Sequence, residues 1–172
     1  QMKTYTVKID NHGNKAWYSN GKLHREDGPA IECANGYKEW WINNQLHRKD
    51  GPAIEWANGG KDWYINGKLH RKDGPAIEWA DGDKHWYLNG KLHREDGPAI
   101  ENVVEGNNFW YLNGQLHRED GPAIEDLDGN KAWYLNGKLV SEQDVLNLSQ
   151  TLEIEGVKYS VAQIKAALKK SA

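Results

Sequence analysis

The chain has 172 residues, of which 38% are hydrophobic and 27% are charged, a composition typical of one folded domain or one elongated array. Its net charge of -3 does not favour duplex nucleic acid or an anionic membrane as a partner. The single cysteine, Cys33, excludes an internal disulfide framework and a cysteine-based zinc site, and no apolar run approaches the ~20 residues of a membrane span.

An internal period organises residues 1–139. After a first predicted strand, "KTYTVKI", a block of the form Trp-Tyr-x-Asn-Gly-Lys-Leu recurs and alternates with His-Arg-x-Asp-Gly-Pro-Ala-Ile-Glu. The leucines of the first block are spaced by 23, 23, 23, 24 and 23 residues, at Leu23, Leu46, Leu69, Leu92, Leu116 and Leu139. A fixed period of this length is typical of an array in which each unit packs only against its neighbours.

Each unit reads as a pair of hairpins. In the second, the turn dipeptides Asn58-Gly59 and Asn66-Gly67 flank the β-rich stretch "KDWYIN". A two-residue turn at Asn58-Gly59 predicts one packed face with Ile54, Trp56, Trp63 and Ile65. The opposite, solvated face then holds Ala53, Glu55, Asp62 and Tyr64. By the same pattern we expect Cys33 to replace a tryptophan as a small apolar residue, and His12 and His85 to lie on the surface.

Two points of register stay open or irregular. A two-residue turn at Asn66-Gly67 places Leu69 on the face of the tyrosines, whereas a three-residue turn places it on the face of the tryptophans. The fourth unit carries one extra residue in "ENVVEGNNFWY", for which we predict a β-bulge. This stretch, Asn102 to Asn108, is the most individual surface of the array.

After Leu139 the repeat stops. Ser141 with Asp144 predicts the start of a short helix, "TLEIEGVKYS" reads as a hairpin around Glu155-Gly156, and Ser160 could begin a helix "VAQIKAALKK". We expect residues 140–172 to form a small α/β cap on the last open edge, with the first strand acting in the same way at the other end. The predicted fold class is a mainly β, elongated antiparallel β-meander array with a C-terminal cap.

The period, the hairpin units and the Trp/Tyr-x-Asn-Gly-Lys blocks make residues 9–139 resemble MORN-type repeats, and more closely the MORN-variant class of bacterial, phage and giant-virus proteins. This resemblance implies an elongated antiparallel β-meander used as a non-catalytic interaction scaffold. Because the sequence shows no membrane span and "QMKTYTVKID" lacks a signal-peptide core, we expect the chain in the cytoplasm, of a bacterial or infected host cell. The His-Arg-x-Asp-Gly-Pro-Ala block departs from the usual pattern, so phospholipid partners do not carry over. The family supplies no catalytic residue.

The histidine column could suggest metal or acid–base chemistry. Equivalent histidines, however, should lie about 10 Å apart across two strands of a sheet, whereas two ligands of one zinc ion lie about 3–4 Å apart. We therefore predict no metal site, no cofactor and no catalytic site, and a structural role for the block. In that role Asp27 accepts backbone N–H bonds at the Asp-Gly-Pro corner, and the arginine pairs with a carboxylate such as Glu32.

The function that we predict is a non-enzymatic scaffold that binds another protein, such as a phage-encoded inhibitor of a host factor. The alternatives are a sponge for a small nucleotide of host defence signalling and, less favoured, an enzyme. The tryptophans could stack on bases, but we expect them to form the core. Candidate binding residues are Arg25, Arg48, Arg71, Arg94, Arg118, His47, His70, His93, Tyr64, Tyr87, Tyr111, Asn107 and Asn108. The sequence leaves the oligomeric state open.

Overall fold

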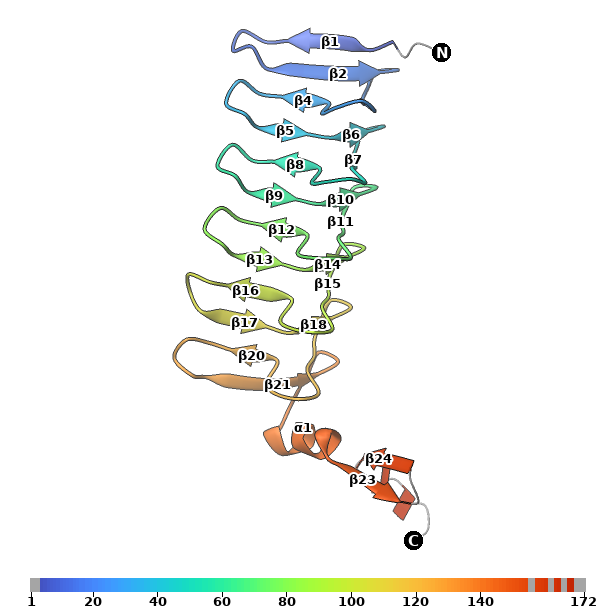
Figure 1. Cartoon of the computed structure of the whole chain (residues 1–172), viewed down its shortest axis with the longest axis vertical. Helices are drawn as coiled ribbons and strands as arrows, with labels where there is room; N and C mark the ends of the chain where they lie inside the picture. The colour runs from blue at the N-terminus through green and yellow to red at the C-terminus, as the bar shows by residue number, and fades with distance from the viewer. Residues whose placement is uncertain (1–3, 155–156, 161–162, 165–166, 169–172) are drawn as a thin grey trace.

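The computed structural model describes residues 4–154, 157–160, 163–164 and 167–168. It shows a long antiparallel ladder of short strands, with the chain advancing one hairpin at a time from the N-terminal to the C-terminal end (Figure 1). The predicted mainly β meander is confirmed. Within the described part of the chain, no helix has the length and apolar character needed to cross a membrane.

A 14-stranded sheet runs the length of the array. In spatial order its strands are β1 (Thr6–Ile9), β2 (Lys15–Ser19), β4 (Ile31–Glu32), β5 (Lys38–Glu39), β8 (Ile54–Glu55), β9 (Lys61–Asp62), β12 (Ile77–Glu78), β13 (Lys84–His85), β16 (Ile100–Asn102), β17 (Asn107–Phe109), β20 (Ile124–Glu125), β21 (Lys131–Leu135) and β22 (Lys138–Val140), with β3 (Lys22–Leu23) paired to β2.

Short hairpins branch from this sheet along one side (Figure 1). They are β6 (Trp41–Ile42) with β7 (Gln45–Leu46), β10 (Tyr64–Ile65) with β11 (Lys68–Leu69), β14 (Tyr87–Leu88) with β15 (Lys91–Leu92), and β18 (Tyr111–Leu112) with β19 (Gln115–Leu116). Each is closed by two residues with positive φ, as at Asn66 (φ 50°) and Gly67 (φ 73°). Tyr64 therefore lies opposite Leu69, which resolves the open register in favour of the two-residue turn.

The other turn differs from the prediction by one residue. Ile54 pairs with Asp62, because three residues separate Trp56 from Gly60. The Gly59 amide donates to the Trp56 carbonyl at 2.9 Å, the Trp56 amide donates to the Gly60 carbonyl at 2.9 Å, and Gly59 has a φ of 96°. This is a type I turn followed by a glycine in the left-handed region. The two-residue turn was wrong, and a one-residue change in register moves side chains to the opposite face.

We call one face of the sheet the tryptophan–arginine face. Here a tryptophan of one unit alternates with an alanine of the next hairpin, as shown by the Trp40 amide donating to the Ala53 carbonyl and the Trp63 amide to the Ala76 carbonyl. The alanines are fully buried, at Ala30, Ala53, Ala76, Ala99 and Ala123. A small residue is required because large rings from both neighbouring strands cover the position.

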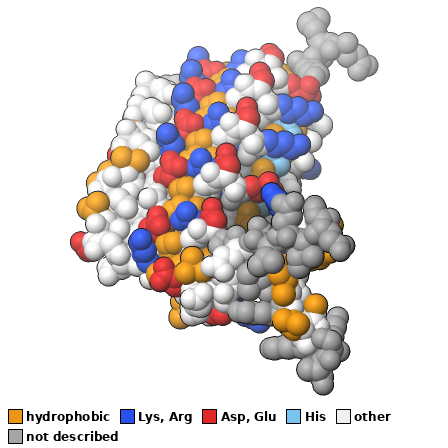
Figure 2. Space-filling view, turned by 60° about the horizontal axis from the view of Figure 1, so that its bottom comes forward, with side chains coloured by type: hydrophobic (Ala, Val, Ile, Leu, Met, Phe, Trp, Pro, Cys, Tyr) orange, Lys and Arg blue, Asp and Glu red, His pale blue; other side chains and the backbone are white. Residues whose placement is uncertain are grey.

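A charge ladder runs along the same face, next to the tryptophans. In spatial order it consists of Lys15, Glu32, Lys38, Glu55, Lys61, Glu78, Lys84, Glu101, Asn108, Glu125 and Lys131. Figure 2 shows basic and acidic side chains alternating in rows along the array. Opposite charges directly across from each other stabilise a pair by roughly 0.2–1 kcal/mol, so this ladder favours the observed register over a shifted one.

We call the opposite face the isoleucine face. Its central column alternates an isoleucine with a residue that differs in every unit, in the order Ile31, Glu39, Ile54, Asp62, Ile77, His85, Ile100, Phe109, Ile124 and Ala132. The prediction of a solvated position at Asp62 was wrong, since that residue is 8% exposed. The predicted single packed face with Ile54 and Trp63 together was also wrong.

The extra residue of the fourth unit lengthens a loop. Asn102 pairs with Asn107, Glu101 with Asn108, and Ile100 with Phe109, so residues 103–106 form a four-residue loop where the other units have three. The strands keep the register of their neighbours, and the predicted bulge was wrong. A loop at the sheet edge accommodates an insertion without breaking ladder hydrogen bonds.

The C-terminal segment begins with α1 (Glu142–Ser149), which lies against β21. Ser141 and Asp144 form the predicted capping box, and Val145 is 2% exposed. β23 (Thr151–Ile154) then pairs with β24 (Val157–Ser160), which confirms the hairpin. The Ser160 hydroxyl accepts from the Gln163 amide at 3.1 Å. Residues 163–164 and 167–168 are helical, and the remainder of the expected second helix lies outside the described residues.

Candidate binding face

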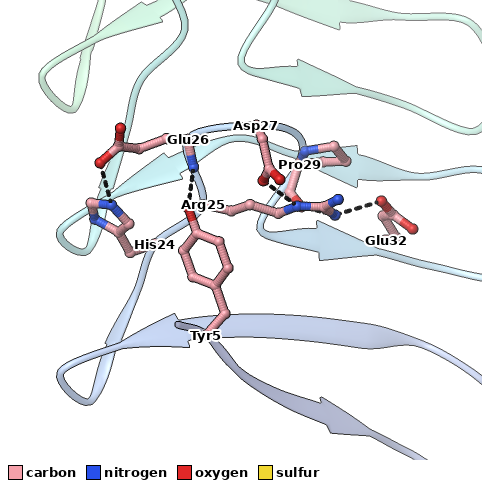
Figure 3. Close-up of polar contacts among 7 residues, drawn as sticks. All are labelled: Tyr5, His24, Arg25, Glu26, Asp27, Pro29 and Glu32. Atoms are coloured by element: carbon pink, nitrogen blue, oxygen red, sulfur yellow. Dashed lines mark hydrogen bonds and ion pairs between the residues drawn. The ribbon is translucent and has the colours of Figure 1, made fainter. Parts of the chain in front are cut away.

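The repeated arginine is bound inside its own unit. In the first unit Arg25 Nε donates to Asp27 Oδ1 at 3.0 Å, and Nη1 donates to the Pro29 carbonyl at 3.1 Å and to Glu32 Oε1 at 3.0 Å (Figure 3). Its guanidinium carbon lies 4.2 Å from the centre of the Trp17 ring. The predicted pair of the arginine with Glu32 is confirmed.

The other four units repeat this arrangement. The guanidinium carbons lie 3.9–4.0 Å above the tryptophan rings, as Arg48 over Trp40, Arg71 over Trp63, Arg94 over Trp86 and Arg118 over Trp110. The arginine side chains are 20–23% exposed. The glycine of the Asp-Gly-Pro corner belongs to the same arrangement, because a Cβ on Gly74 would lie 2.9 Å from Arg71 Cζ. The block is thus a structural device that closes each corner over a tryptophan.

The repeated histidine joins one unit to the next. The Asn66 amide donates to His47 Nδ1 at 3.1 Å, and Asn66 Oδ1 lies 2.8 Å from the same nitrogen. His70 makes the equivalent contacts with Asn89. An unprotonated Nδ1 accepts from the amide, and a protonated Nδ1 donates to the side-chain oxygen, so either form holds the neighbouring turn.

The remaining histidines of the column follow the same rule. His93 Nδ1 accepts from the Asn113 amide at 3.1 Å, and His117 Nδ1 accepts from the Asn136 amide at 3.0 Å. Across the residues that the structure describes, no three His, Cys, Asp or Glu side chains are arranged to hold a metal ion. The Nδ1 atoms of the histidines and the Nε and Nη1 atoms of the arginines are therefore engaged in contacts within the array.

The isoleucine face differs between its two halves. In the N-terminal half one buried and one half-buried acid accept from aromatic donors: Trp56 Nε1 donates to Asp62 Oδ2 at 3.0 Å, and the Tyr37 hydroxyl and Trp41 Nε1 both donate to Glu39. Burial raises the pKa of Asp62, and the hydrogen bond from Trp56 opposes that shift. Burial also raises the pKa of Tyr37, reinforced by its contact with Glu39.

The candidate tyrosines lie on the isoleucine face as well. Tyr64, Tyr87 and Tyr111 are half-buried, and burial raises the pKa of each hydroxyl. The Tyr87 ring lies 6.4 Å from the ring of His85. The tyrosines thus share a face with the variable column, whereas the candidate arginines lie on the opposite side of the sheet.

In the C-terminal half the isoleucine face is hollowed. An open depression of about 440 Å³ is lined by Trp79, Asp81, Asp83, His85, Ile100, Asn102, Phe109 and Tyr111, and we call it the aromatic hollow. Trp79 and His85 meet edge to face at 4.4 Å. Burial lowers the pKa of His85, partly offset by its hydrogen bond to Asn102. The prediction of His85 as a lone surface histidine was wrong.

The two candidate asparagines are separated by the sheet. Asn107 lies opposite Asn102 beside the aromatic hollow, and Asn108 takes a place in the charge ladder between Glu101 and Glu125. The hollow was not predicted from the sequence because its lining residues come from two adjacent units and share a face only in the observed register. The available signal was the variation among units at positions 79, 85 and 109.

Similarity to other proteins gives no assignment. No protein-family model matches the chain, and no curated protein is significantly similar to it.

Proposed function

We propose that this chain is a non-enzymatic, MORN-like repeat scaffold that binds another protein through its isoleucine face. The observation that carries the proposal is the exposure of large aromatic side chains there: Trp56 is 45% exposed and Trp79 is 41% exposed. Tryptophan is among the residues most enriched in the energetically dominant parts of protein interfaces.

Apolar exposure continues at the edge of this face. The hairpin loops of the fourth and fifth units carry Val103, Val104 and Leu127, which are exposed next to the strands that form the aromatic hollow. Contiguous exposed apolar side chains bordered by polar residues are typical of an interaction surface. We propose this edge as the rim of the contact.

Variation between units supports the same face. The tryptophan–arginine face repeats one set of internal contacts in five units, so every unit presents the same side chains there. The isoleucine face presents a different residue in each unit at the position of Asp62. A surface whose chemistry changes along its length can distinguish one partner from another.

The internal contacts of the arginines weigh against the nucleotide alternative. A phosphate would need guanidinium donors, but Nε and Nη1 of Arg71 already donate to Asp73, Pro75 and Glu78. A phosphate that used the remaining Nη2 donors would lie close to the carboxylates of Asp73 and Glu78, and like charge would oppose it.

The test is affinity capture from host-cell lysate with the full chain and with Trp79→Ala. Trp79 suits the test because its ring contacts His85, whereas the Trp56 ring donates a hydrogen bond to the buried carboxylate of Asp62, which its removal would leave without that donor. We expect a stoichiometric protein partner that the variant loses, with at least tenfold weaker binding once that partner is purified. The matched control is Val7→Ala, an apolar residue of similar exposure (44%) on β1.

Equal loss in both variants, or no stoichiometric partner for the full chain, would contradict the proposal. Circular dichroism of each variant, compared with the unchanged chain, separates lost binding from lost folding.

A further inference from the structure

The aromatic hollow combines aromatic rings with uncompensated carboxylates. Trp79, Phe109 and Tyr111 contribute rings from two adjacent units, and Asp81 and Asp83 line the same depression. Ring faces carry negative electrostatic potential and attract cations within about 6 Å. Both kinds of group thus favour positive charge in the hollow.

The carboxylate of Asp83 is held by a hydrogen bond from the loop of the next hairpin. Asp83 Oδ1 accepts from the Val103 amide at 2.7 Å, and the Asp83 amide is 3.3 Å from Asp81 Oδ1. Among the ion pairs of the described residues, neither aspartate has an arginine or lysine partner. The second oxygen of each carboxylate is therefore available to an external donor.

The basic groups near this region differ in charge and in position. His85 lines the hollow itself, and desolvation favours its neutral form. The hairpin loops at this edge, residues 10–14, 33–37, 56–60, 79–83, 102–107 and 126–130, contain no lysine or arginine, and their acids are Asp10, Asp81, Asp83, Glu105, Asp126 and Asp128. Lys84 lies between Asp83 and His85 in sequence but belongs to the charge ladder of the opposite face.

We infer that the aromatic hollow receives a lysine or arginine side chain of the protein partner. This inference rests on the proposed function and names the chemistry of the partner segment. The cation would lie against the rings of Trp79, Phe109 and Tyr111 and pair with Asp81 and Asp83. An anionic segment would meet two carboxylates, and a purely apolar segment would bury them without a partner.

The experiment is a titration of the ¹⁵N-labelled full chain with capped hexalysine and capped hexaarginine, and with capped hexaglutamate as the anionic control. We expect saturable shifts of the Trp79 indole N–H for the basic peptides and none for hexaglutamate. The double variant Asp81→Asn/Asp83→Asn keeps acceptors for the Asp83 and Val103 amides but removes both charges. Its affinity should fall at least fivefold.

Two further variants separate this site from general charge attraction. Asp50→Asn/Asp73→Asn changes the net charge by the same amount on exposed corners of the arginine blocks and should bind within twofold of the unchanged chain. Phe109→Leu removes a ring but no charge and should weaken binding several-fold.

Unaltered affinity of the Asp81→Asn/Asp83→Asn variant, equal loss in the corner variant, or no localised shifts at Trp79 would overturn the inference. The purified partner then distinguishes the two proposals. A partner that depends on Trp79 but binds the Asn double variant with full affinity overturns the cation site and leaves the scaffold standing. A full chain that captures no partner removes the proposed function itself.

Discussion

Replacing Arg71 by methionine removes the group that closes one corner of the array. The guanidinium stacks 3.9 Å from the Trp63 ring, donates to the Pro75 carbonyl at 3.1 Å and pairs with Glu78 at 2.8 Å. A partly exposed cation–π contact is worth about 0.5–1 kcal/mol, an unsatisfied carbonyl costs about 1–3 kcal/mol, and a partly exposed ion pair adds about 0–1 kcal/mol. We expect the free energy of unfolding to fall by about 2–4 kcal/mol.

Urea unfolding followed by far-UV circular dichroism and by tryptophan fluorescence measures this loss, and coincident curves test whether one transition describes the array. Arg71→Lys keeps the charge but removes the planar guanidinium that stacks on the ring and its forked donors. The free energy of unfolding should therefore fall by about half as much as in Arg71→Met. The matched control Lys72→Met changes an exposed neighbour and should stay within about 0.5 kcal/mol. An Arg71→Met chain as stable as this control would refute the structural role of the block.

Three further predictions follow from individual contacts. Gly74→Ala should lower the urea midpoint because its Cβ meets Arg71 Cζ at 2.9 Å, and the loss should largely vanish in the Arg71→Met background. Because the pKa of Asp62 is raised on folding, the contribution of this residue to the free energy of unfolding is greatest below the ordinary carboxyl pKa. It falls as the pH rises through the raised pKa. Asp62→Asn should therefore raise the urea midpoint at pH 7, with a gain that disappears near pH 3; a gain independent of pH would contradict this. Burial raises the pKa of Cys33, so iodoacetamide should alkylate it more slowly in the native chain than in urea, and equal rates would exclude that burial.

The repeat and the positions of its turns were predictable because they depend on residues close in sequence. The period, the hairpins and the Ser141 cap all follow from local patterns, and the structure shows each of them. The pair of the arginine with Glu32 was predictable too, because the corner brings the two ends of one block together.

Which face each residue occupies was not predictable from the turn dipeptides alone. Asn58-Gly59 and Asn66-Gly67 look alike, but the first belongs to a three-residue loop in which only the glycine has positive φ, and the second is a two-residue turn in which both do. The cross-strand charges held the missing information, since only the observed register places Glu55 opposite Lys61. The aromatic hollow depends on that register and was missed with it.

The four-residue loop at 103–106 shows that the edge of the isoleucine face can change in length while the strand pairing stays the same. An insertion there leaves the strand pairing unchanged, so loop residues can be gained, lost or exchanged while every unit keeps its tryptophan, arginine and glycine. Duplication of a 23-residue unit would lengthen the isoleucine face by one fixed step. If that face binds a protein as proposed, changes of loop residues could alter the partner without any change of the strands.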